Sequence, residues 1–82
     1  MEKQLTVLIV DDEAMIRLFA KEFLDEANFN TVLASNADEA IAALERRSDI
    51  RAVITDVQMP GSMDGLKLAA AVRKRWPDMS PL

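Results

Sequence analysis

Three short apolar runs alternate with segments of helical period, and this alternation restricts the chain to a few folds. The first run, residues 5–10, is almost continuously apolar and rich in β-branched residues, which suits a strand buried on both faces. Similar short runs follow at residues 30–34 and 51–55. Strands that alternate with helices imply right-handed parallel crossovers. We therefore predict an α/β fold with a parallel sheet, in the order β-α-β-α-β-α.

The first helical segment has an apolar stripe with polar residues opposite it. A stripe of this kind normally faces the core. Asp11 or Asp12, which precede the segment, can cap it, because aspartate is a favoured N-cap residue. The stripe comprises Ile16, Phe19, Ala20, Phe23 and Ala27, and the polar side comprises Arg17, Lys21, Asp25 and Asn28.

The second and third helical segments show clear start and stop signals. Asn36 and Glu39 have the spacing of a capping box at the start of the second. Asp64 is placed to cap the third, and Pro77 ends it. We expect Trp76 to anchor the edge of the core. We expect the basic run 73–75 to interact with the negative end of the helix dipole rather than to form a binding patch.

Composition excludes several functional classes. The chain has 82 residues, which fits one domain spanning residues 1–82, and its net charge of −4 comes without an extended basic block. Nucleic acid and anionic membranes are therefore poor partners. Cysteine and histidine are both absent, which excludes disulfides, thiolate metal sites and a histidine base. No apolar stretch approaches the ~20 residues that span a bilayer, and residues 1–4 lead into a segment too short for a signal peptide. We expect a cytoplasmic protein.

Three aspartates follow the first and third predicted strands. Asp11 and Asp12 come directly after the first, and Asp56 comes directly after the third. If these strands are parallel neighbours, all three carboxylates meet at one edge of the sheet, where ligands of open α/β sheets bind. Their mutual repulsion favours a hard divalent cation, and Mg²⁺ suits such an oxygen site. The alternatives are simple capping for the pair and an ordinary turn role for Asp56.

Three segments of the chain resemble the signature segments of response-regulator receiver domains, which have a flavodoxin-like fold. They are residues 7–13, residues 54–61 and the Met63-Asp64-Gly65 turn, and the resemblance extends over essentially all 82 residues. It implies that Asp56 is the phosphoacceptor. It also implies that Mg²⁺ is held by Asp12 directly, by Asp11 mainly through water, by Asp56 and by the backbone carbonyl of Gln58.

The resemblance implies a signalling role rather than an enzyme. Asp56 would accept a phosphoryl group from a separate histidine kinase or phosphotransfer protein, because the chain has no histidine of its own. One alternative is a truncated receiver that acts as an interaction or dimerisation module without phosphorelay activity. An aspartate-nucleophile phosphatase is disfavoured, because such enzymes use an Asp-X-Asp motif, and Asp11-Asp12-Glu13 does not match it.

The resemblance also implies that this chain corresponds to the N-terminal two-thirds of a receiver. We expect strands four and five of the family to be absent, together with the switch Ser/Thr and the Lys that follow them. The outer edge of the third strand would then be uncovered, and such an edge is a template for pairing with another chain. We therefore expect a homo-oligomer, formed through third-strand edges or by exchange of C-terminal segments.

Overall fold

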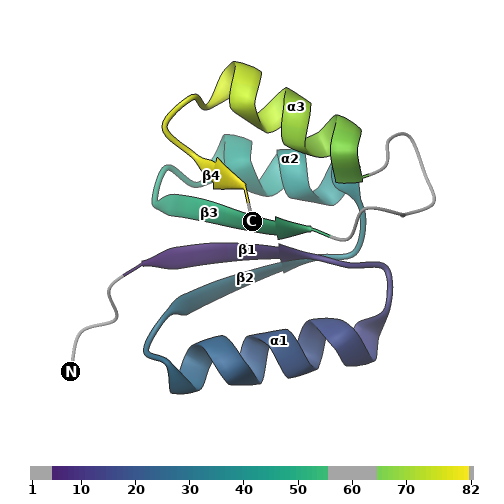
Figure 1. Cartoon of the computed structure of the whole chain (residues 1–82), viewed down its shortest axis with the longest axis vertical. Helices are drawn as coiled ribbons and strands as arrows, with labels where there is room; N and C mark the ends of the chain where they lie inside the picture. The colour runs from purple at the N-terminus through teal and green to yellow at the C-terminus, as the bar shows by residue number, and fades with distance from the viewer. Residues whose placement is uncertain (1–4, 56–64, 82) are drawn as a thin grey trace.

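The computed structural model describes residues 5–55 and 65–81, which form a parallel sheet with helices on both faces (Figure 1). The strands and helices alternate in the predicted order. They are β1 (Thr6–Val10), α1 (Ala14–Glu26), β2 (Asn30–Ala34), α2 (Ala37–Arg46), β3 (Ile50–Thr55), α3 (Gly65–Arg75) and β4 (Ser80–Pro81).

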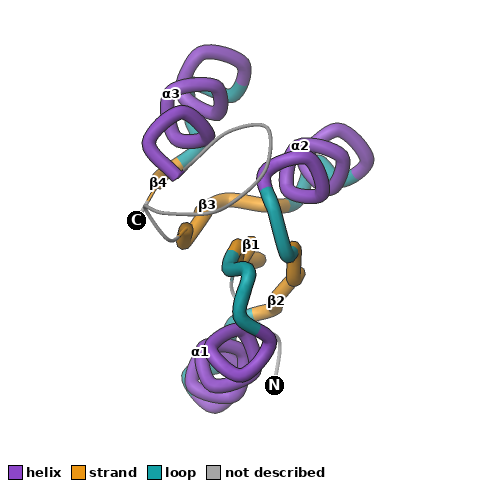
Figure 2. Tube along the Cα trace, turned by 90° about the vertical axis from the view of Figure 1, so that its right-hand side faces the viewer, coloured by secondary structure: helices purple, strands orange, loops and turns teal. Residues whose placement is uncertain are grey.

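The sheet has the strand order β2-β1-β3-β4, and all neighbours are parallel. Viewed along the strands, α1 lies on one side of the sheet and α2 and α3 lie on the other (Figure 2). The arrangement confirms the predicted α/β fold with a parallel sheet. It also places the first and third strands side by side, as the expected acidic site requires.

The fourth strand corrects one expectation. We expected the chain to supply no fourth strand, but Ser80 and Pro81 pair with Ala52 and Val53 at the outer edge of β3. The turn before β4 is closed by a 2.9 Å hydrogen bond from the Met79 N–H to the Trp76 carbonyl. The edge of β3 is therefore partly covered by the chain itself, as Figure 1 shows.

The main core lies between the sheet and the pair α2 and α3. Leu8 and Val10 of β1, Val53 of β3, and Leu68 and Val72 of α3 are almost completely buried there. Small residues of α2 allow this helix to lie close to the sheet: Ala37, Ala40 and Ala43. Trp76 is partly buried and packs against this core, so its predicted role as an edge anchor is confirmed.

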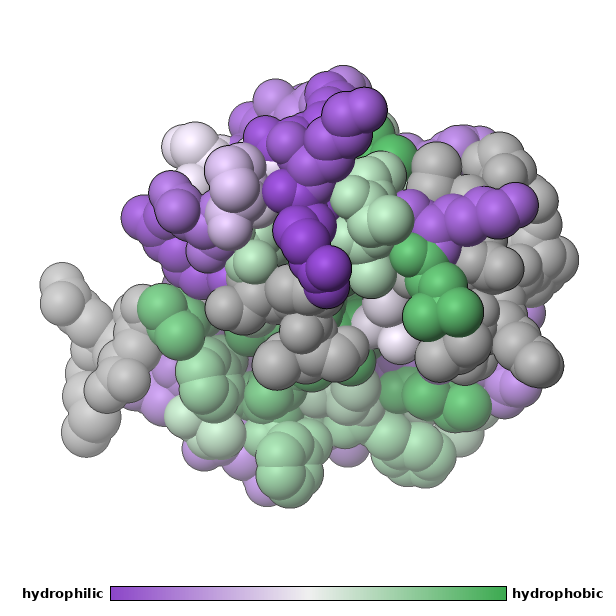
Figure 3. Space-filling view, turned by 45° about the horizontal axis from the view of Figure 1, so that its top comes forward, coloured by the Kyte–Doolittle hydropathy of each residue, from purple (hydrophilic) through white to green (hydrophobic). Residues whose placement is uncertain are grey.

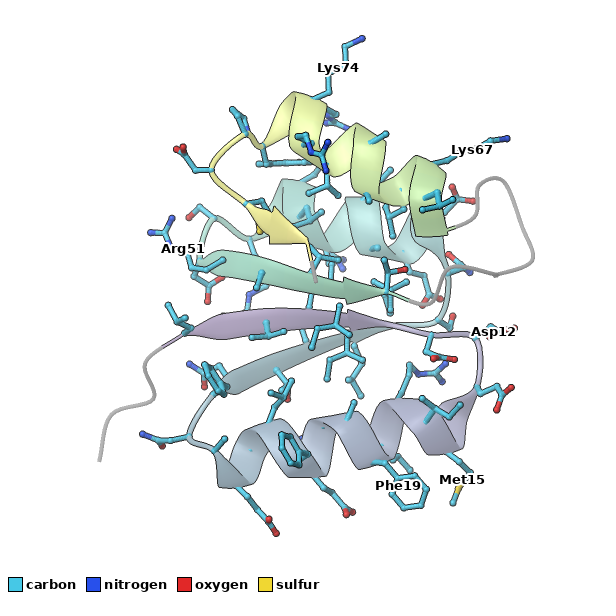
Figure 4. All side chains as sticks on the ribbon, viewed as in Figure 1. Asp12, Met15, Phe19, Arg51, Lys67 and Lys74 are labelled. Carbon is cyan, nitrogen blue, oxygen red and sulfur yellow. The ribbon has the colours of Figure 1, made fainter. Side chains whose placement is uncertain are left out.

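The opposite face corrects a second expectation. The apolar stripe of α1 was expected to face the core, but Ile16, Phe19 and Phe23 are exposed and no residue of α1 is fully buried. Met15 and Phe19 extend away from the sheet in Figure 4. Apolar side chains gather over this lower part of the molecule, below the hydrophilic α3 side (Figure 3). Ala20 of the predicted stripe is half-buried and Ala27 lies just beyond the helix, so the predicted orientation was wrong for the large apolar residues.

The end of α1 also differs in detail from the sequence interpretation. Asn28, which we had assigned to the polar side of the helix, lies beyond it with a φ of 72°. Asparagine tolerates this left-handed conformation better than most residues. The Asn28 N–H donates to the Asp25 carbonyl and the Phe29 N–H donates to the Leu24 carbonyl. This is a Schellman-type end, which turns the chain directly into β2.

Candidate functional site

The candidate site lies at the carboxyl edge of the two central strands. The register of β1 and β3 ends at the pair Val10 and Thr55. The next residue in the sequence is Asp11 on one strand and Asp56 on the other. Asp56, Gln58 and Asp64 lie outside the described residues, so the geometry of the edge is that of Asp11, Asp12 and the segments around them.

Asp11 is the buried member of the pair. It is only 8% exposed, and its N–H continues the ladder by donating to the Ala34 carbonyl at 3.1 Å. Its carboxylate Oδ1 accepts a 2.9 Å hydrogen bond from the Glu13 N–H. A buried carboxylate with one neutral donor is costly unless a cation or further donors compensate its charge. Asp12 beside it is exposed, at the end of β1 in Figure 4.

Neither aspartate caps α1, which corrects the simpler interpretation of the pair. The N-cap residue is Glu13, and its side chain makes no capping hydrogen bond. Asp11 instead bonds to the N–H two residues ahead, in the manner of an Asx turn. The pair is therefore placed by the strand end and the turn, and capping does not account for two carboxylates in succession.

Arg17 is a site residue that the sequence analysis missed. Its Nη1 donates to the backbone carbonyl of Asp11, which ties the first turns of α1 to the end of β1. The charge of Arg17 also contributes to a lowered pKa of Glu39, although hydrogen bonds from Ser35 are the larger cause. The signal in the sequence was an arginine within the first turns after an aspartate pair. We had assigned it only to the polar side of the helix.

The start of α2 borders the same edge and follows its predicted capping pattern. The Glu39 N–H donates to Asn36 Oδ1 at 2.8 Å, as predicted. The Glu39 carboxylate, however, reaches back to Ser35 rather than to Asn36. Glu39 Oε1 accepts from both the Ser35 N–H and the Ser35 hydroxyl, each at 2.7 Å. These bonds rigidify the turn that leads from β2 into α2.

The donor set at this edge suits a hard divalent cation. Asp11 and Asp12 supply adjacent carboxylate oxygens, one buried and one exposed, and Mg²⁺ prefers such ligands while keeping several waters. Within residues 5–55 and 65–81, no group of three His, Cys, Asp or Glu side chains converges as a metal site. The expected third and fourth ligands, Asp56 and Gln58, are outside these ranges.

Comparison with known proteins identifies the family. Residues 7–81 match the model of the response regulator receiver domain. This chain belongs to that family. The receiver domain is also similar to solved structures of the same kind. The response regulator TrrA of Thermotoga maritima, in complex with Mg²⁺ and BeF, aligns with a TM-score of 0.88 and 35% identity over 95% of this chain and 66% of that one.

Curated relatives of this receiver domain are much longer. The hydrogenase transcriptional regulatory protein HoxA of Cupriavidus necator is 40% identical over 95% of this chain and 16% of its own length. The transcriptional regulatory protein ResD of Bacillus subtilis is 39% identical over 84% of this chain and 28% of its own length. The match is therefore to the receiver segment of two-component response regulators, which is only a part of those longer proteins. None of its described helices is both long and apolar enough to cross a membrane.

Proposed function

We propose that this receiver domain accepts a phosphoryl group on Asp56 from a histidine kinase or phosphotransfer protein. The observation that carries the proposal is the register of β1 and β3, which ends at Val10 and Thr55 and continues in the sequence into Asp11 and Asp56. Membership of the receiver family supports the same assignment. The protein would act in the cytoplasm as a phosphoacceptor rather than as an enzyme with turnover on a separate substrate.

The chemistry is a nucleophilic substitution at phosphorus. A carboxylate oxygen of Asp56 attacks the phosphoryl group, the bond from phosphorus to the donor's imidazole nitrogen breaks, and an acyl phosphate forms. Asp11, Asp12, Asp56 and the Gln58 carbonyl would hold Mg²⁺, which when bound neutralises negative charge at this edge. Arg17 and the Glu13 N–H position Asp11 through its carbonyl and its carboxylate.

Phosphorylation by a small donor tests this function. Incubation with acetyl phosphate and Mg²⁺ should add one phosphoryl group, seen by intact mass and removed by hydroxylamine. Asp56→Asn should add none, while Asp38→Asn, an exposed carboxylate on α2, should label as the parent does. Labelling of the Asp56→Asn protein would move the acceptor elsewhere. No labelling of any form, with intact Mg²⁺ binding, would favour the alternative of an interaction module.

Metal binding is tested separately from phosphorylation. Asp12→Ala should lose most of the affinity for Mg²⁺ in a calorimetric titration, because it removes an exposed carboxylate at the edge. Asp64→Ala serves as the control and should retain the parent affinity. Equal affinity in the Asp12→Ala protein and the parent would contradict the ligand assignment.

We also propose that the chain forms a homo-oligomer. The two-residue β4 pairs with Ala52 and Val53, so it covers only part of the six-residue β3. Strand addition or exchange of the C-terminal segment would complete this edge. Sedimentation at micromolar concentration would test it, and a monodisperse monomer would exclude it. The double variant Phe19→Gln/Phe23→Gln distinguishes pairing of strand edges from association through α1. If the oligomer forms through strand edges, the double variant should still form it.

A further inference from the structure

A second site candidate lies at the opposite end of the sheet from the aspartates. A pocket of about 230 Å³ opens where β3 begins and α3 ends, and its lining residues include Ile50, Arg51, Arg75, Trp76, Asp78 and Met79. Figure 4 shows Arg51 and Asp12 at opposite ends of the strands. The proposed phosphoacceptor function uses none of these residues.

The pocket combines an apolar wall with cationic groups. Ile50 is almost completely buried, and Trp76 and Met79 are partly buried against the main core. Arg51 and Arg75 are exposed at the rim. Asp78 is the one carboxylate among the lining residues. This is the pattern of a small ligand site, in which apolar surface holds the body and a few polar groups fix its orientation.

Positive charge is concentrated around this pocket in a chain that is acidic overall. Residues 45–51 and 73–79 contain six of the ten Lys and Arg residues and only three of the fourteen Asp and Glu residues. Two of these acids are already paired: Asp49 with Arg47, at 2.7 Å, and Glu45 with Arg75, at 2.6 Å. Arg51 makes no ion pair within the described residues, so its charge is available to a ligand.

Arg75 is held in place before any ligand arrives. Its Nη2 donates to Glu45 Oε2, and its guanidinium carbon lies 4.5 Å from the centroid of the Trp76 ring. A planar guanidinium fixed on two sides loses little freedom when its remaining N–H groups bind an anion. This arrangement goes beyond the dipole interaction that we expected for the basic run 73–75.

We propose that this pocket binds a small organic anion, a phosphate or carboxylate group attached to a flat apolar body. The anionic group would bind Arg51 and Arg75, and the body would pack on Trp76, Ile50 and Met79. Ligand pockets of about 300–1,000 Å³ hold drug-sized molecules. The volume of about 230 Å³ is therefore matched to a body of a single ring. Asp78 at the rim opposes the anion and disfavours ligands with high negative charge.

Trp76 provides a direct readout, because it is the only tryptophan in the chain and tyrosine is absent. Phenyl phosphate is the probe, with excitation at the red edge of the indole band, where a phenyl ring does not absorb. It should change the fluorescence saturably. Benzyl alcohol, which lacks the anion, and inorganic phosphate, which lacks the ring, should both bind more weakly. Calorimetry with phenyl phosphate serves as a second measurement.

Arg51→Gln and Lys74→Gln form the matched pair of variants. Both remove one positive charge, but Lys74 is not among the lining residues and extends outward from α3 in Figure 4. Arg51→Gln should weaken phenyl phosphate binding by about tenfold, the loss of one charge-assisted contact. Lys74→Gln should keep the parent affinity for phenyl phosphate, and the Asp78→Asn protein should bind phenyl phosphate more tightly than the parent does. Circular dichroism checks that each variant folds.

Several results would overturn the assignment. If phenyl phosphate causes neither a saturable fluorescence change nor heat of binding with the parent protein, the proposed site does not exist. Equal weakening by Arg51→Gln and Lys74→Gln would reduce it to diffuse attraction between charges. Inorganic phosphate binding as tightly as phenyl phosphate would remove the role of the apolar wall. Binding of an acidic peptide but not of phenyl phosphate would make the patch a protein-docking surface instead of a small-molecule site.

Discussion

The two faces of the sheet are built differently, although they share the same strands. On the α2 and α3 side, Leu8, Val53, Leu68 and Val72 are almost completely buried in one core. On the other side, α1 covers β1 and β2, and its largest apolar side chains are exposed; Phe23 is 73% exposed. All five residues of β1 are nevertheless buried, so the two faces differ in the helices that cover them and not in the burial of this central strand.

The two faces differ because of the side that α1 turns toward the sheet. The half-buried side of this helix includes Ala20 and Leu24, and also Arg17, Lys21 and Asp25. All three charged side chains are engaged in polar contacts: Lys21 pairs with Asp25, and Arg17 donates to the Asp11 carbonyl. Charged groups thus occupy much of the inner side of α1, and the large side chains of the apolar stripe, Ile16, Phe19 and Phe23, remain outside. Exposed apolar patches of this kind usually mark a surface for association.

The largest expected effect on stability comes from shortening a buried side chain of the main core. Leu68→Ala should lower the free energy of unfolding by about 2–5 kcal/mol, because a fully buried leucine leaves a cavity when it is truncated. Leu66→Ala is the matched control on the same helix, with a side chain that is 66% exposed, and should change it by less than about 0.5 kcal/mol. Urea denaturation measures both. Similar losses in the two variants would contradict the assigned packing of α3.

The N-caps of α1 and α2 should contribute differently to stability. Asn36→Ala should cost about 1 kcal/mol, because Asn36 accepts the hydrogen bond that caps α2. Glu13→Ala should cost much less, since Glu13 is the N-cap of α1 but makes no side-chain capping bond. Denaturant midpoints of the two variants, compared with the parent, decide the matter. A larger loss for Glu13→Ala would show that the two caps were assigned in the wrong order.

The sequence predicted most of the fold because its signals were local. The second strand was predicted at residues 30–34 and is observed there, and the capping bond between Asn36 and Glu39 follows from spacing alone. The orientation of α1 was not predictable in this way. An apolar stripe shows that a helix is amphipathic, but tertiary contacts such as that of Arg17 with Asp11 decide which side faces the sheet.

The candidate site was predictable only in part. The position of Asp11 at the strand end followed from the sequence. Its place one residue beyond the Val10 and Thr55 pair required the pairing of β1 with β3. The two-residue β4 was missed because Pro81 lowers strand propensity and the run is too short to show alternation. The pocket beside Trp76 was missed because it joins residues 48–51 to residues 75–79, which no local pattern connects.

A small effect is expected on the outer side of α1. Phe19→Gln replaces a side chain that is 63% exposed with a residue of good helix propensity. The free energy of unfolding should stay within about 0.5 kcal/mol of the parent in dilute protein. Thermal and urea unfolding at low concentration measure it. A loss comparable to that of Leu68→Ala would show that this side of α1 is covered in solution.

The smallest expected effect is a pH dependence at the start of α2. Hydrogen bonds from the Ser35 N–H and hydroxyl hold the pKa of Glu39 below its usual value of 4.5, with the charge of Arg17 adding to the effect. A lowered folded-state pKa means that the carboxylate stabilises the fold above its unfolded pKa, and that this contribution is lost as the pH falls through the folded pKa. The free energy of unfolding of the Glu39→Gln protein should therefore differ from that of the parent at neutral pH and converge with it in acid. Urea unfolding at a series of pH values measures this. A Glu39→Gln profile parallel to the parent's through the acid range would show that the Ser35 bonds contribute nothing to stability.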